Sequence, residues 1–350
     1  MPVLYNKYSK EELKKRLNEE TFKRITLSFY RYVRIEEVEV FRDEFYKNLH
    51  ELKVLGRIYV ASEGVNAQIS VPDFNFEAFK NLLNIDERFK NMRLNIAVED
   101  NGKSFYKLIV RVKHKIVADG LDDKTFDPGN VGQHLNAKEF NEALEDPNTV
   151  VVDMRNHYES EIGHFEKAVL PDADTFKQEL PIVLDILKDK KDKKILLYCT
   201  GGVRCEKASA YLKHKGFNDV NQLYGGIIHY IREIKQEGLP SKFKGKNFVF
   251  DERLGERIGD EIISQCHQCG SSCDNHTNCA NDDCHLLFIQ CEFCAVRMQG
   301  CCTVSCKEII NLPVEEQRKL RKGKVNEHPH AVYKSRLRPN LMKVLKEKQQ

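Results

Sequence analysis

Two kinds of hydrophobic spacing occur in the first third of the chain. Apolar residues at alternate positions or in short blocks predict β-strands over residues 24–30, 57–61, 67–71, 94–98 and 107–117. Apolar residues three or four positions apart predict helices over 38–55 and 76–85. Apart from one additional strand, the order strand–helix–strand–strand–helix–strand is that of a ferredoxin-like α+β domain, which we expect over residues 1–119. RNA-binding and acylphosphatase-like domains share this fold, so it assigns no function alone.

A different pattern predicts a second domain over residues 133–240. Residues 150–153 and 194–198 are short apolar runs typical of buried strands, and residues 136–139 have the sequence of a capping box that begins a helix. Residues 206–213 predict another helix, which ends at a glycine. Strands that alternate with helices indicate an α/β domain with a parallel sheet. The segment between the two domains, residues 120–132, contains Gly and Pro and is the predicted linker.

Length and composition favour a multidomain α/β protein of the cytoplasm. The chain has 350 residues, 41% of them hydrophobic, and contains no apolar run long enough for a membrane-spanning helix. Its first residues lack the apolar core of a signal peptide. We therefore expect a cytoplasmic protein that has no membrane partner.

The net charge of +3 conceals a basic C-terminal segment. Residues 318–348 contain eleven Lys and Arg but two Glu, a local charge of +9. Because this segment has few apolar residues, we expect 313–350 to be a disordered tail that orders only on an anionic partner, and nucleic acid is the natural one. A purely solubilising tail is the alternative.

The strongest chemical signal is Cys199. It lies between the predicted strand 194–198 and the predicted helix 206–213, in a Gly-rich turn formed by Thr200, Gly201, Gly202 and Val203. Backbone N–H groups at a helix N-terminus and the charge of Arg204 favour a thiolate, which is the nucleophilic form of cysteine. The alternative is a buried cysteine at the end of a strand that has only a packing role.

The spacing of this loop resembles that of rhodaneses. Four residues separate Cys199 from Arg204, whereas cysteine phosphatases use a loop that is one residue longer. A tighter ring suits a single sulfur or a small anion. Three further matches occur in the order found in rhodanese domains: Asp153-x-Arg155 with Glu159, then residues 163–165, then residues 223–227. The resemblance implies that Asp153, Arg155 and Glu159 support the loop.

A cysteine-rich module is predicted over residues 246–312. Ten of the twelve cysteines lie between Cys266 and Cys306. Two CxxC pairs, Cys266/Cys269 and Cys291/Cys294, have the spacing of a zinc ribbon, and their thiolates can converge on one tetrahedral ion. The other six cysteines are enough for a second metal, although spacing does not assign its ligands. An iron–sulfur cluster and redox-active or simply packed thiols are the alternatives to zinc.

Four segments together resemble the rhodanese-related tRNA uridine hydroxylase family, namely residues 62–68, 199–206, 245–253 and 267–291. The resemblance covers residues 1–312 and implies oxygen-dependent conversion of the wobble uridine of tRNA to 5-hydroxyuridine. Molecular oxygen would be the co-substrate. A rhodanese-type sulfurtransferase, which passes a persulfide to an acceptor, is the alternative enzyme. A non-catalytic tRNA-binding protein is the third possibility.

The resemblance carries the role of nucleophile to Cys199. Cys205 is a second thiol six residues along, which can attack an adduct on Cys199 or simply pack, and either cysteine can be the essential one. His157 and Glu159 have the His-x-carboxylate spacing of an iron site, but Glu159 already belongs to the rhodanese pattern. No Gly-x-Gly-x-x-Gly motif follows a predicted strand, so flavin and nicotinamide have no sequence support.

The tRNA partner requires a basic surface. Cationic and aromatic residues at the ends of two strands of the first domain suit phosphate contact and base stacking: Arg31, Tyr32, Arg34, Arg111, Lys113 and His114. Ordinary solvated strand ends are the alternative. The target uridine must be unstacked to reach a thiol, which is easiest in a single-stranded anticodon loop.

Overall fold

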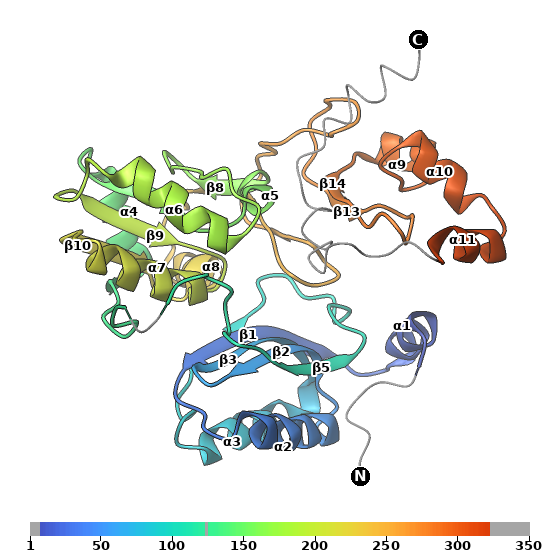
Figure 1. Cartoon of the computed structure of the whole chain (residues 1–350), viewed down its shortest axis with the longest axis horizontal. Helices are drawn as coiled ribbons and strands as arrows, with labels where there is room; N and C mark the ends of the chain where they lie inside the picture. Colours follow the sequence, from blue (N-terminus) through green and yellow to red (C-terminus); the bar gives the residue numbers. More distant parts are fainter. Residues whose placement is uncertain (1–7, 123–124, 323–350) are drawn as a thin grey trace.

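The computed structural model describes residues 8–122 and 125–322. Figure 1 shows three parts: an N-terminal domain at the bottom, an α/β domain at the upper left and a C-terminal module at the upper right. The α/β domain and the C-terminal module lie over the same face of the N-terminal sheet, whose other face is covered by helices.

The N-terminal domain has the predicted ferredoxin-like order. Its elements are α1 (Lys10–Glu19), β1 (Arg24–Tyr32), α2 (Val38–Glu51), β2 (Leu55–Ala61), β3 (Gly64–Pro72), the 3-10 helix η1 (Asp73–Asn75), α3 (Phe76–Ile85), β4 (Asn95–Ile96) and β5 (Leu108–Val112). The strand order is β4-β1-β3-β2-β5, and β5 is the fifth strand, parallel to β2. The sheet therefore extends the predicted unit by one strand at the β2 edge.

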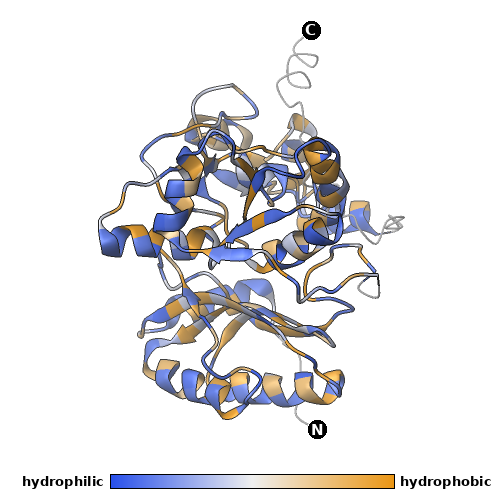
Figure 2. Cartoon of the chain, turned by 90° about the vertical axis from the view of Figure 1, so that its left-hand side faces the viewer, coloured by the Kyte–Doolittle hydropathy of each residue, from blue (hydrophilic) through white to orange (hydrophobic). Residues whose placement is uncertain are grey.

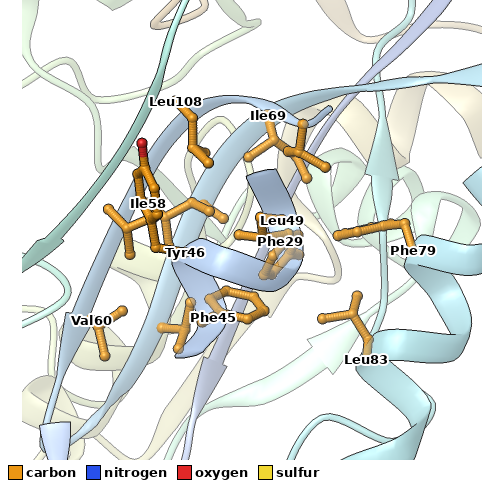
Figure 3. Packing of buried hydrophobic residues seen from close by; sticks show 14 of the residues in the cluster. Phe29, Phe45, Tyr46, Leu49, Ile58, Val60, Ile69, Phe79, Leu83 and Leu108 are labelled. Atoms are coloured by element: carbon orange, nitrogen blue, oxygen red, sulfur yellow. The ribbon is translucent and has the colours of Figure 1, made fainter. Parts of the chain in front are cut away.

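Alternation along the strands separates the core from a second, polar face. Phe29 of β1 packs against Phe45 and Leu49 of α2 and Phe79 of α3, all nearly inaccessible to solvent, as Figure 3 shows. Because successive strand residues point to opposite faces, the even-numbered residues of β1 face away from these helices. That polar face is turned toward the α/β domain.

The predicted parallel sheet is confirmed in the second domain. Its elements are β6 (Gln133–Leu135), α4 (Ala137–Glu145), β7 (Val150–Asp153), α5 (His157–Ser160), β8 (Gly163–Phe165), α6 (Phe176–Leu187), β9 (Lys194–Tyr198), α7 (Val203–His214), β10 (Asp219–Leu223) and α8 (Gly226–Glu237). The order is β6-β10-β9-β7, with every pair parallel. The capping box at Asn136 and Glu139 is present. Figure 2 shows hydrophobic and hydrophilic residues alternating along the helices that cover the sheets.

The C-terminal module is held to the α/β domain by strand pairing. It comprises β11 (Phe243–Asn247), β12 (Glu256–Arg257), β13 (His276–Asn278), β14 (Leu287–Ile289), α9 (Glu292–Met298), α10 (Val304–Ile310) and α11 (Val314–Arg321). Strand β11 pairs antiparallel with β8. No helix among the described residues is long and apolar enough to cross a membrane.

The expectation that residues 313–350 are disordered was wrong for residues 314–321. Residues 314–321 form α11, whose Gln317 side chain donates hydrogen bonds to the carbonyls of Ile310 and Leu312. These bonds attach α11 to the end of α10. Residues 323–350, which hold most of the predicted tail, lie outside the described part of the chain.

Candidate active site

Cys199 lies at the carboxyl end of β9, below the first turn of α7. That helix begins at Val203, three residues earlier than predicted, because Gly202 takes a left-handed φ of +99° and turns the chain into the helix. The N–H of Gly202 donates to Cys199 Sγ at 3.1 Å. Cys199 has no exposed surface. The loop therefore places the sulfur on backbone donors at the positive end of a helix.

Opposing effects set the pKa of Cys199. Burial raises it, but a hydrogen bond from Cys205, the charge of Arg204 and the N–H groups of residues 204 and 205 lower it to about 6. An ordinary cysteine has a pKa of about 8.5, so Cys199 is largely a thiolate at neutral pH. The predicted activation of this thiol follows from the geometry.

Cys205 is the partner of that thiolate. Burial and the hydrogen bond to Cys199 raise the pKa of Cys205 well above its usual range. Cys205 is thus a neutral thiol that donates to the Cys199 sulfur. The two cysteines form a hydrogen-bonded pair in which Cys199 is the thiolate and Cys205 the donor.

Arg204 is fixed by a bidentate ion pair with Glu159. Arg204 Nη1 lies 2.6 Å from Glu159 Oε1, and Nη2 lies 2.9 Å from Oε2. Glu159 is fully buried, and Thr200 Oγ1 donates to it at 3.3 Å. A planar carboxylate facing a planar guanidinium sets the orientation of Arg204, while its charge still acts on Cys199.

The Asp153-x-Arg155 motif lies deeper in the domain. Arg155 is fully buried and contacts both Asp153 oxygens, at 2.8 and 2.6 Å, while also donating to the carbonyl of Gly163 at 2.6 Å. The hydroxyl of Tyr198, next to Cys199, donates to Asp153 at 2.7 Å. This network ties the ends of β7 and β9 together and positions the loop that follows.

The N-terminus of α8 holds the other side of the loop. Ile227 N donates to the carbonyl of Cys199 at 3.0 Å, and Ile228 N donates to that of Thr200 at 3.2 Å. Gly226 has φ +67°, and a Cβ there would lie 2.5 Å from the Cys199 oxygen. A side chain at residue 226 is therefore excluded by the closeness of the backbone of residues 199–201.

The N-terminal domain covers the loop, which the sequence did not predict. Asn95 Nδ2 donates to the carbonyl of Gly201 at 3.3 Å. The hydroxyls of Tyr30 and Tyr32 donate to Glu206 Oε1 at 2.8 Å and to the carbonyl of Val203 at 3.2 Å, respectively. The signal available in the sequence was the polar alternation of Ser28, Tyr30 and Tyr32 along one face of β1.

Comparison with known proteins gives the same three regions. Residues 24–116 match the UPF0176 acylphosphatase like domain, residues 136–233 the rhodanese-like domain, and residues 244–307 the rhodanase C-terminal region. The chain is 58% identical to the tRNA uridine(34) hydroxylase of Leptospira interrogans, over 97% of this chain and 92% of that one. The enzyme of the same name from Pectobacterium atrosepticum is 56% identical, over 93% and 92%.

The chain belongs to the tRNA uridine(34) hydroxylase family. The predicted resemblance is therefore confirmed, together with the acylphosphatase-like, rhodanese-like and cysteine-rich organisation. The relatives are named as enzymes, and the rhodanese-like match contains the Cys199 loop and its supporting residues.

This member of the hydroxylase family also buries a carboxyl group that the sequence did not single out. Glu179 lies in the first turn of α6 and has no exposed surface. Neither carboxyl oxygen has a hydrogen-bond partner among the described residues. Burial raises its pKa well above the usual range, and the negative charges of Asp153, Glu159 and Cys199 add to the effect against the opposing charge of Arg204. Glu179 is therefore a neutral acid behind the catalytic loop.

Of the six residues predicted to contact tRNA, four are exposed and two make contacts within the protein. Arg34, Arg111, Lys113 and His114 are exposed. Arg31 donates to the carbonyl of Lys90 at 3.0 Å. Tyr32 is half-buried, its hydroxyl donates to the carbonyl of Val203, and the charge of Lys207 lies 5.3 Å from its ring, so Tyr32 belongs to the contact between the two domains.

An exposed aromatic residue lies instead beside the loop. Tyr224 immediately precedes the Gly225–Gly226 turn and is 39% exposed. The guanidinium of Arg93 lies 4.2 Å from the centre of its ring, and the rings of His134 and His229 lie 5.8 and 5.2 Å away. An aromatic face, a cation and two imidazoles thus lie together beside the Gly225–Gly226 turn, which contacts the loop of Cys199.

The four predicted metal ligands converge in the family's C-terminal module. The sulfurs of Cys266, Cys269, Cys291 and Cys294 all lie within 4.8 Å of one another, and those of Cys269 and Cys291 are 3.7 Å apart. Four thiolates about 2.3 Å from a tetrahedral Zn²⁺ would be about 3.8 Å apart. The donor set and its dimensions therefore fit zinc.

This cysteine group packs on the helix that carries Glu159. Cys266 and Cys294 belong to one buried cluster with Tyr158 and Ile162, and His267 Nε2 lies 3.0 Å from Glu161. The module therefore supports α5 from behind. The alternative iron site is not assembled here, because Glu159 holds Arg204 while His157 Nδ1 lies 2.9 Å from Asp174.

Proposed function

We propose that this protein hydroxylates the wobble uridine of tRNA at C5, with Cys199 as the nucleophile. The observation that carries the proposal is a buried thiolate in a rhodanese loop, in a chain 58% identical to a tRNA uridine(34) hydroxylase. Within this proposal Arg204 stabilises the thiolate, and Cys205 donates a hydrogen bond to it and holds the exchangeable proton.

The chemistry of uracil suits such a thiolate. C6 is the electron-poor end of the C5=C6 bond, which is conjugated to the C4 carbonyl, so a thiolate adds at C6. The addition leaves C5 electron-rich, and C5 is the carbon that receives the hydroxyl oxygen. Molecular oxygen is the proposed co-substrate, as the family resemblance implies. One of its oxygen atoms is bonded to C5, and the other is reduced to water by two thiols that become a disulfide. Loss of the C5 proton and departure of the Cys199 thiolate from C6 then restore the C5=C6 bond.

The surface around Tyr224 suits a flipped base from the anticodon loop. Tyr224 offers an aromatic face for stacking, and Arg93 offers a cation for a phosphate or a carbonyl oxygen. Exposed Arg111, Lys113 and His114 lie on or just after β5, at the opposite edge of the N-terminal sheet from β4, and offer further cations for phosphates. We place this activity in the cytoplasm, where tRNA is modified.

Zinc at the Cys266/Cys269/Cys291/Cys294 group has a structural role in this proposal. Four thiolates fill the tetrahedral coordination of Zn²⁺ and leave no open position for substrate. Its contribution is to order the module that packs on α5, and so to hold Glu159 against Arg204.

Nucleosides of tRNA from cells that lack the protein test the proposal. Mass spectrometry should show loss of 5-hydroxyuridine and of nucleosides derived from it, with thiolated nucleosides unchanged. Loss of a thiolated nucleoside with 5-hydroxyuridine retained would contradict hydroxylation and favour the sulfurtransferase alternative, which the rhodanese loop also suits.

Base stacking on Tyr224 is tested by a matched pair of variants. Tyr224→Phe keeps an aromatic face, so affinity for the anticodon stem-loop should stay within about twofold of the wild type. Tyr224→Ala should weaken it by about 5- to 150-fold, because base–aromatic stacking contributes about 1–3 kcal/mol. Equal affinities of the two variants would remove Tyr224 from the proposed binding surface.

A further inference from the structure

A second group of four cysteines lies in the outer half of the C-terminal module. Cys279 follows β13, Cys284 lies in the next loop, and Cys302 and Cys306 flank the beginning of α10. Their sulfurs all lie within 4.8 Å of one another. We propose that these four thiolates bind a second structural Zn²⁺, separate from the ion of the Cys266/Cys269/Cys291/Cys294 group.

The spacing of the sulfurs is that of a metal site and not of a disulfide. Cys284 Sγ lies 3.6 Å from Cys302 Sγ, which lies 3.8 Å from Cys306 Sγ. The edge of a tetrahedral Zn²⁺ site with Zn–S bonds of about 2.3 Å is about 3.8 Å long, whereas a disulfide requires about 2.05 Å. All four cysteines are free thiols.

Donors around the sulfurs match the outer shell of a thiolate site. The N–H of Cys302 donates to Cys279 Sγ at 3.4 Å, and Asn281 Nδ2 donates to Cys306 Sγ at 3.5 Å. Such bonds orient thiolate ligands and offset part of their negative charge. Cys279 and Cys302 are only 3% and 2% exposed, so a set of ionised thiols here requires a cation.

This half of the module has little else to hold it. Its buried cluster contains Phe288 and cysteines, with Leu286 and Ile310 packed partly against it. Helices α10 and α11 have 7 and 8 residues, too short to be stable alone. A metal supplies the missing stabilisation in such small cores, because its binding free energy becomes folding free energy. The proposed ion therefore fixes α10, and through it α11.

The proposed occupant is zinc, which four thiolates bind in tetrahedral geometry. Tetrahedral four-sulfur sites take Zn²⁺ or iron.

Hydrogen bonds join the second group to the first: Gln268 donates to the carbonyls of Cys301 and Cys302, each at 3.0 Å, and Gln290 donates to Gln268 at 2.9 Å. Because Gln268 precedes Cys269, the two groups are neighbours in one folded unit while sharing no cysteine.

Metal analysis of the full chain, purified without chelators, tests the proposal. The wild type should contain two zinc ions per chain, and Cys284→Ser and Cys269→Ser should each contain one. Cys273→Ser and Cys301→Ser are matched controls that should keep two, because both residues are cysteines of the module outside the two groups. One zinc per chain in the wild type, or two in Cys284→Ser, would overturn the second site.

A ligand swap separates metal loss from misfolding. Cys284→His keeps a zinc ligand at the half-buried residue 284 and should retain two ions. Cobalt reconstitution of wild-type protein should reach its full tetrahedral thiolate absorbance at two equivalents per chain. Saturation at one equivalent, or iron in place of zinc in the purified protein, would contradict the proposal. Neither readout depends on hydroxylase activity.

Discussion

The hydroxyl of Tyr32 in β1 donates a hydrogen bond at 3.2 Å to the carbonyl of Val203, the first residue of α7. With Asn95 bound to Gly201 and Tyr30 bound to Glu206, this contact places three side chains of the N-terminal domain along one side of the catalytic loop. The thiolate is therefore enclosed by two domains. The reactive environment belongs to the pair of domains and not to the rhodanese-like domain alone.

Replacement of Cys205 should change the titration of Cys199. Cys205→Ala removes the side-chain donor that helps lower the pKa of Cys199 to about 6, so the pKa should rise. Cys205→Ser keeps a hydroxyl donor and should leave the pKa near the wild-type value. The rate of iodoacetamide alkylation against pH, with modification at Cys199 identified by mass spectrometry, gives the midpoints. Identical midpoints for the Ala and Ser variants would remove the hydrogen bond from the account.

Glu159 and Arg204 should shift the same midpoint in opposite directions. Glu159→Gln removes the negative charge that offsets Arg204, so the pKa of Cys199 should fall. Arg204→Gln removes the positive charge, so the pKa should rise. Each single change breaks a buried ion pair and should lower the free energy of unfolding by about 3–5 kcal/mol. The double variant should lie between the two midpoints. Shifts of the same sign in both single variants would contradict this assignment.

Glu179 should make the protein less stable as the pH rises. Its folded-state pKa is raised, so the unfolded chain loses its proton at a lower pH than the folded chain does. The stability contributed by the neutral acid is complete below the unfolded pKa and is lost as the pH rises toward the folded pKa. Glu179→Gln cannot ionise, so its melting temperature relative to the wild type should increase with pH.

The control for Glu179 is Glu237→Gln at the exposed end of α8. This variant removes a carboxylate from an exposed position, and the change with pH for Glu179→Gln should exceed the change for Glu237→Gln. A difference for Glu179→Gln that is the same at about pH 5 and about pH 8.5 would show that Glu179 does not titrate differently in the folded and unfolded states.

Removal of residues 323–350 should reduce the salt dependence of tRNA binding. The removed segment contains seven Lys and Arg, while α11 is retained. For each tRNA phosphate that the truncated chain no longer neutralises, the slope of log affinity against log salt should become shallower by about 0.7 to 0.9. The alkylation rate of Cys199 should not change. A salt slope equal to that of the full chain would place the phosphate-binding residues on the folded domains.

Much of this architecture follows from local sequence. Alternating apolar residues predicted the sheet of the N-terminal domain, and the spacing of Cys199 and Arg204 predicted the loop. The support of that loop by Glu159 was implied by the resemblance to rhodaneses. The cover formed by Tyr30, Tyr32 and Asn95 was not predicted. It depends on packing between segments more than a hundred residues apart, which no local period records.

The same limit applies to the cysteines and to α11. The CxxC pairs are visible in the sequence because a turn brings their sulfurs together. Cys279, Cys284, Cys302 and Cys306 have no such common spacing, and only the folded β13–β14 hairpin and α10 bring them together. The residues of α11 are strongly polar, so composition indicated disorder, whereas bonds from Gln317 to the end of α10 hold the helix in place.

The central claim is that the thiolate of Cys199 performs the hydroxylation. Its most direct test is the 5-hydroxyuridine content of tRNA from a strain lacking the protein, complemented with Cys199→Ser or Cys205→Ser and compared with wild-type complementation at equal protein levels. Cys199→Ser should leave tRNA without 5-hydroxyuridine and its derivatives, while Cys205→Ser should restore part of them. Full restoration by Cys199→Ser alone would contradict the account and assign the essential thiol to Cys205. Full restoration by Cys199→Ser combined with Cys205→Ser would leave the chain as a tRNA-binding protein whose loop thiols do no chemistry.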